Sequence, residues 1–175
     1  MSMRKKEPAL GKPARFQPLR FDTARRGERL VGIGFRCWLA GYDTCDISCW
    51  ETGWNYYARE LGPSRAKTAL GELSCWVRAL RDSACRKLDY FPFGCSRFCR
   101  DECLAVSMIA ASQNQACPAL RACAFALLGA SPVDGVVERA AEFGYALDRL
   151  GVHLDSGSVM DASDFLTPVR DGPPH

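Results

Sequence analysis

The chain has 175 residues and a mass of 19.3 kDa, enough for one domain with a single hydrophobic core. Hydrophobic residues make up 47% and charged residues 25%, which excludes a largely disordered or fibrous protein. No apolar run approaches the ~20 residues that cross a bilayer, and the charged residues 1–10 lack the apolar segment of a secretory signal. We therefore expect a cytoplasmic protein with no transmembrane segment, in which thiols stay reduced.

Charge is unevenly distributed along the chain. Residues 1–30 hold nine basic and three acidic side chains, whereas residues 131–175 hold three basic and eight acidic ones. Pro8, Pro13 and Pro18 prevent a continuous helix in the basic segment. These features predict a basic, mostly disordered arm over residues 1–29, a cysteine-rich helical domain over residues 30–154, and an acidic, disordered tail over residues 155–175.

The basic arm has two interpretations. Clustered lysine and arginine are typical of contact with nucleic acid or an anionic surface, but they also occur in solubilising tails. Only Phe16 and Phe21 supply aromatic rings there, and no nucleic-acid-binding motif follows. The case for nucleic acid is therefore weak, and a protein partner is the alternative.

The elements predicted in chain order are helical. Residues 30–42 fit a short helix or a strand. Apolar spacing and helix-ending residues then predict helices over about 44–62, 64–85, 95–113, 117–129 and 132–150. The short loops between them favour an all-α fold, an antiparallel bundle of four to five helices with mobile N- and C-terminal tails. Arg121 is the only charge over 117–129, so we expect that helix to be the most buried.

Ten cysteines are the unusual feature of the composition. Residues four apart stand above one another on a helix, so the C-x3-C and C-x3-C-x3-C spacings predict ladders of thiols. Thiolates arranged in this way can bind zinc, Cu(I) or an iron–sulfur cluster. The grouped residues are Cys45 with Cys49, and Cys95 with Cys99 and Cys103.

Glu102 is the most informative polar residue. On a helix that starts at Cys95, its carboxylate lies on the same apolar face as the thiols. A carboxylate there is costly unless it is paired, protonated or bound to a metal. It is either a metal ligand, or it pairs with an arginine of a neighbouring helix, for which the candidates are Arg78, Arg81 and Arg121.

Thiol ladders on a set of packed helices resemble the bacterial four-helix copper-storage proteins. Those proteins carry thiols on nearly every helix, whereas here the helices predicted over 64–85 and 132–150 hold two and none. No site residue is carried over from that family.

Catalytic motifs are scarce. His153 and His175 are the only histidines, and no nucleophile elbow, phosphate loop or dinucleotide fingerprint occurs. We therefore do not expect an enzyme unless a bound metal supplies the chemistry. Trp50 and Trp54 share a helix face with Tyr57 and Leu61, and the tryptophans are assigned to the core or to an interface.

Two main hypotheses follow. The first is a small cytoplasmic protein that binds a soft metal, zinc before Cu(I) or an iron–sulfur cluster, in a structural or sensory role; its ligands would be Cys45, Cys49, Cys95, Cys99, Cys103 and Glu102. The second is a metal-free regulatory or protein-interaction module, whose cysteines fill the core and whose basic arm contacts a partner or nucleic acid. Redox sensing by reversible thiol pairing is a third alternative.

Overall fold

The computed structural model describes residue 20 and residues 23–160 of the chain. Over that part it is all-helical, which confirms the predicted class, but it has six α-helices rather than four to five and no β-strand. Predictions for residues 1–19, 21–22 and 161–175 fall outside the described residues. The helices are α1 (Arg26–Thr44), α2 (Ile47–Leu61), α3 (Pro63–Ser83), α4 (Arg100–Gln113), α5 (Cys117–Leu128) and α6 (Asp134–Arg149), and a 3-10 helix, η1, spans Ser156–Ser158.

The additional helix is α1, which occupies the region that the sequence left open between helix and strand. Leu30, Phe35 and Leu39 are buried on it. Its glycines weaken the helical signal, yet they allow close packing: a Cβ on Gly34 would lie 2.5 Å from the hydroxyl of Tyr57. The helix begins at Arg26, so residues 26–29 are helical although the sequence placed them in the arm.

The first predicted helix begins later than expected. The last turn of α1 occupies residues 43 and 44, and Cys45 ends that helix in a left-handed conformation with φ 55°. Asp46 then caps α2 by accepting a hydrogen bond from the backbone N–H of Ser48 at 2.9 Å. The chain therefore reverses direction between the two cysteines of the C-x3-C pair.

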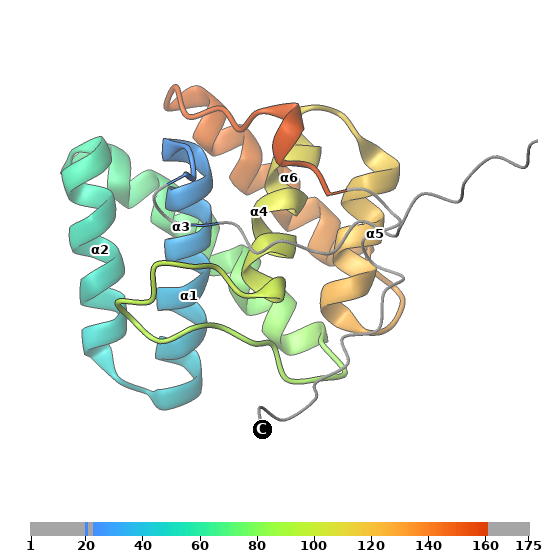
Figure 1. The fold of residues 1–175 in the computed structure, drawn as a ribbon, viewed down its shortest axis with the longest axis horizontal. Coiled ribbons are helices and arrows are strands. Elements are labelled where there is room, and N and C mark those ends of the chain that lie inside the picture. The colour runs from blue at the N-terminus through green and yellow to red at the C-terminus, as the bar shows by residue number, and fades with distance from the viewer. Residues whose placement is uncertain (1–19, 21–22, 161–175) are drawn as a thin grey trace, which may run out of the picture.

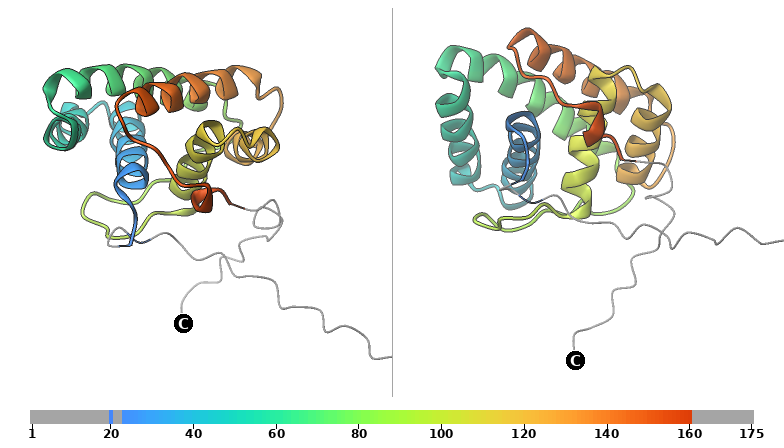
Figure 2. Two further views of the ribbon diagram at one scale, coloured as in Figure 1. Left: turned by 90° about the horizontal axis from the view of Figure 1, so that it is seen from above. Right: turned by 45° about the horizontal axis from the view of Figure 1, so that its top comes forward.

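The helices form two layers (Figures 1 and 2). Helices α3 and α6 lie side by side in one layer, and α1, α4 and α5 lie against them, with α2 next to α1. Between the layers, Trp76 of α3 stacks on Phe143 of α6 with ring centroids 5.6 Å apart, and Phe35 of α1 lies 6.2 Å from Trp76. No described helix is long and apolar enough to cross a membrane.

Helix α4 is the most buried of the described helices. Residues 101–111 are all buried, whereas Phe125 on α5 is 55% exposed. The expectation that the helix over 117–129 lies at the centre was therefore wrong. A helix with few charges is not necessarily buried, because apolar atoms contribute more than half of the accessible surface of a folded protein.

The segment after α6 folds back over α1 and α4. Asn114 and Gln113 bind the backbone of Leu154, and the backbone N–H of Met160 donates to the Ser107 hydroxyl at 2.8 Å. Residues 155–160, predicted as the start of the tail, therefore pack against the helical domain.

Candidate functional site

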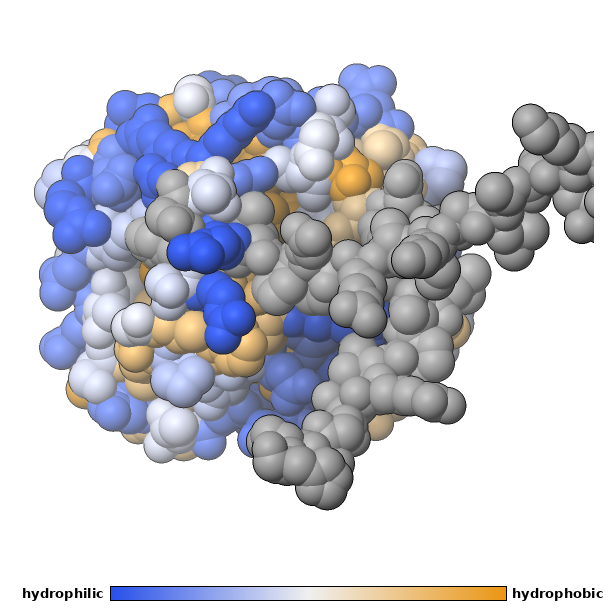
Figure 3. Space-filling view, viewed as in Figure 1, coloured by the Kyte–Doolittle hydropathy of each residue, from blue (hydrophilic) through white to orange (hydrophobic). Residues whose placement is uncertain are grey.

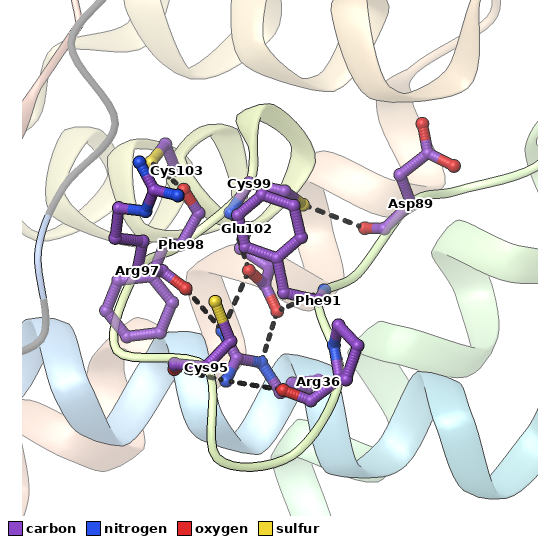
Figure 4. A network of polar contacts seen from close by, with 10 residues as sticks. Arg36, Asp89, Phe91, Cys95, Arg97, Phe98, Cys99, Glu102 and Cys103 are labelled. Atoms are coloured by element: carbon purple, nitrogen blue, oxygen red, sulfur yellow. Dashed lines mark hydrogen bonds and ion pairs between the residues drawn. The ribbon is translucent and has the colours of Figure 1, made fainter. Parts of the chain in front are cut away.

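A buried ion pair organises the loop between α3 and α4, residues 84–99 (Figure 4). The Nε of Arg36 on α1 lies 2.6 Å from Oε1 of Glu102, and its Nη2 lies 3.1 Å from Oε2. The Arg36 side chain is 5% exposed and that of Glu102 is 0% exposed. Arg36 also donates to the carbonyl oxygens of Cys95 at 3.1 Å and Arg97 at 2.8 Å, so one guanidinium fixes the loop to α1.

The remaining hydrogen-bonding capacity of Glu102 is used by the backbone. The carboxylate accepts from the N–H of Cys99 at 2.7 Å and of Phe91 at 3.3 Å. Of the two roles that the sequence allowed for Glu102, the structure shows pairing with an arginine. Its partner is Arg36 of α1, however, and not Arg78, Arg81 or Arg121, because the sequence had not established that residues 30–42 form a helix.

Cys99 caps α4 rather than continuing a thiol ladder. Its sulfur accepts from the backbone N–H of Glu102 while Glu102 accepts from the N–H of Cys99, which is a capping box with cysteine in the place of serine. The Cys99 thiol also donates to the carbonyl of Asp89 at 3.3 Å. Burial, followed by the Glu102 charge, raises the pKa of Cys99 to about 12.

The start of α4 at Arg100 places Cys95 and Cys99 outside the helix that was predicted to carry three thiols. Cys95 lies in the loop, half-buried, and Cys103 is buried with its thiol 3.8 Å from the carbonyl oxygen of Phe98. The assumed regular helix from residue 95 was wrong. Cys99, followed three residues later by Glu102, was the available signal for the true helix start.

The other cysteine pair is divided between two helices. Cys45 ends α1 and is exposed, while Cys49 is buried on α2. Across residue 20 and residues 23–160, no three His, Cys, Asp or Glu side chains form a group that could hold a metal ion. All six predicted ligands lie in this range, and metal binding by them stays a prediction.

A second candidate site lies on α1 and α2. We call it the tryptophan face: Trp38 of α1 with Trp50 and Trp54 of α2. Together with Glu51 and Asn55, these side chains line an open pocket of about 580 Å³. Trp54 is 39% exposed, whereas the fourth tryptophan, Trp76, is fully buried.

The geometry of α2 explains why these rings are not in the core. Its buried residues are Cys49, Gly53, Tyr57 and Leu61, each four positions after the last, so Trp50 and Trp54 lie one residue to the side of this stripe. A Cβ on Gly53 would lie 2.7 Å from the ring of Trp38. The sequence prediction assigned Trp50 and Trp54 to the core or to an interface. It could not choose between the two, because it gave no weight to a glycine as a contact position.

A comparison of this chain with protein-family models, with curated proteins and with solved structures finds no match.

Proposed function

We propose that this protein is a protein-interaction module, and that it docks a partner segment carrying an arginine or lysine side chain on the tryptophan face. The observation that carries the proposal is the open pocket of about 580 Å³ between three indole rings and Glu51. A few hot-spot residues supply most of the binding energy of a protein interface, and tryptophan is among the residues most enriched at these positions. Three indoles around one pocket would supply such a centre.

Charge on this face favours a cationic side chain in the partner. Glu51 is exposed and takes part in no ion pair within the described part of the chain. A guanidinium or ammonium group near an indole face gains ~0.5–1 kcal/mol at an exposed site. Glu51 adds a carboxylate at the edge of the same pocket, so an acidic partner segment would be repelled.

The contacts of the thiols support a packing role for several cysteines. The thiols of Cys99 and Cys103 lie near backbone carbonyls, and the Cys123 thiol is 3.3 Å from the Ser107 hydroxyl. Burial raises the pKa of Cys123 to about 11, which favours the neutral thiol. No disulfide joins any of the ten cysteines, all of which lie within the described residues, and this fits the reduced thiols that we expect.

The docking proposal is tested with an acetylated pentapeptide that has arginine at its centre and alanine elsewhere. The indole N–H signals of ¹⁵N-labelled protein report on the four tryptophans separately. We expect saturable shifts for Trp38, Trp50 and Trp54, and no shift for Trp76, which is buried in the core. The same peptide with a central glutamate should shift none of them.

Variants identify the surface. Trp54→Ala should weaken peptide binding by about 2 kcal/mol, the loss typical of a central interface tryptophan, and Glu51→Gln by less than half of that. Phe125→Ala removes an exposed aromatic ring on α5 and is the matched control, expected to bind normally. Equal responses to the arginine and glutamate peptides, or equal losses in the Trp54 and Phe125 variants, would refute the proposal.

Elemental analysis of protein purified without oxygen decides between this proposal and a soft-metal site. About one equivalent of zinc, copper or iron, lost when Cys95, Cys99 and Cys103 are replaced by alanine, would favour the metal-binding function instead. If the metal content is the same in that variant, these thiols do not bind the metal.

A further inference from the structure

A pocket separate from the tryptophan face opens between α1, α2 and the loop of residues 84–99. Its volume is about 350 Å³, within the range of small-molecule sites in proteins. Figure 3 shows hydrophobic surface where this loop crosses in front of α1. Its lining includes Ile33, Arg36 and Cys37 of α1, Thr52 and Arg59 of α2, and Phe93 of the loop.

The wall formed by the loop is held in place by the buried ion pair. Arg36 binds the carbonyl oxygens of Cys95 and Arg97 and is itself held by Glu102. Ile33, Cys37 and Phe93 give the pocket an apolar lining. Burial raises the pKa of Cys37 to about 12, so this thiol is neutral and adds no charge. A preformed apolar pocket binds without first ordering its walls.

The charge in the lining is positive. Among the described residues that line it, two are arginines and none is an aspartate or glutamate. The charge of Arg36 is balanced by Glu102 in the interior. The guanidinium of Arg59 lies over the ring of Tyr56, with its Cζ 5.2 Å from the ring centroid. The Arg59 side chain is 71% exposed, and Nε of Arg59 lies 3.7 Å from a carboxylate oxygen of Glu60. The stacked guanidinium therefore offers donors at the edge of an apolar pocket.

We propose that this pocket binds a small molecule with an apolar body and an anionic head group, such as a medium-chain carboxylate. The body would contact Ile33 and Phe93, and the head group would bind the guanidinium of Arg59. Thr52 adds no hydroxyl donor to the head group, because its hydroxyl already donates to the carbonyl of Ser48 at 2.8 Å.

The three isoleucines of the chain make a direct test. Ile33 lines the pocket, Ile47 is 66% exposed at the start of α2, and Ile109 is fully buried in the core. With ¹³C-labelled isoleucine δ1 methyl groups, octanoate should shift the signal of Ile33 saturably and leave those of Ile47 and Ile109 in place. Octylammonium, which has the same chain length and the opposite charge, should bind at least about fivefold more weakly.

Substitutions of arginine separate the contribution of charge from that of apolar contact with the ligand. Arg59→Gln should weaken octanoate binding about fivefold and leave 1-octanol binding unchanged, and Arg59→Lys should restore most of the affinity. Arg149→Gln is the matched control, because Arg149 lies over Tyr145 on α6 in the same stacked arrangement, 5.9 Å from the ring centroid. No saturable shift of Ile33 at millimolar octanoate, equal binding of octylammonium, or equal losses in both arginine variants would overturn the proposal.

Discussion

The buried pair of Arg36 and Glu102 allows a quantitative prediction. The change Glu102→Gln keeps the shape of the side chain and removes its charge, which leaves the guanidinium of Arg36 buried at 5% exposure without its counter-charge. The carboxylate also accepts hydrogen bonds from the N–H groups of Cys99 and Phe91, and the amide nitrogen of glutamine cannot accept one. Breaking one side of a buried pair costs about 3–5 kcal/mol, so we expect the free energy of unfolding to fall by about 3 kcal/mol.

Urea unfolding followed by circular dichroism measures this change. Glu28→Gln is the matched control, because Glu28 has the same position in the first turn of α1. It accepts from the backbone N–H of Arg25 and from the hydroxyl of Ser158. Loss of that cap should cost about 1 kcal/mol.

A double variant separates the charge from the packing. Arg36→Met combined with Glu102→Leu removes both charges and should be more stable than Glu102→Gln alone. If Glu102→Gln costs no more than Glu28→Gln, the pair does not hold the loop in the way that we describe.

Further predictions concern the thiols and the packing of α1. Burial raises the pKa values of Cys37, Cys99 and Cys123 from 9.0 to between about 11 and 12. Above pH ~9 the unfolded chain therefore loses thiol protons that the folded protein keeps, and the free energy of unfolding should fall by at most about 1.4 kcal/mol per buried thiol per pH unit. Urea midpoints at about pH 8 and pH 10 test this. Iodoacetamide should label the native protein fastest at its exposed cysteines, which are Cys45, Cys75, Cys85 and Cys117. Mass spectrometry measures the labelling at each cysteine, and rapid labelling of a buried one would contradict the packing. Gly32→Ala places a Cβ 2.5 Å from the buried ring of Phe98, so it should lower the free energy of unfolding by about 1–3 kcal/mol, measured by urea unfolding. Gly71→Ala on α3 is the control: the space around Gly71 is open, so this change should raise the free energy of unfolding slightly.

Regular, amphipathic helices were predictable because their periodicity depends on local sequence. The helix predicted over 64–85 is α3, on which Leu70, Leu73 and Val77 are buried. The preceding helix, predicted to end at residue 62, ends at Leu61. The helix around residues 30–42 could not be predicted in the same way. Glycines obscure its pattern, and the reason for those glycines lies on other elements, such as Tyr57 against Gly34 and Phe98 against Gly32.

The candidate sites show the same limit. The sequence correctly singled out Glu102 as a carboxylate that must be paired or bound, because burial of an unpartnered charge is too costly on any fold. It could not identify Arg36 as the partner, since the two residues lie 66 positions apart and meet only when α1 packs against α4.

By itself, then, the sequence determined that the domain is helical, where most of its helices end, and that Glu102 needs a partner. These properties follow from backbone hydrogen bonding within a helix and from the cost of removing a charge from water. Tertiary packing alone decided that Arg36 is the partner of Glu102, that Trp50 and Trp54 flank an open pocket, and that a loop covers α1. Each depends on how closely two helices approach, which is set by side chains distant in the sequence.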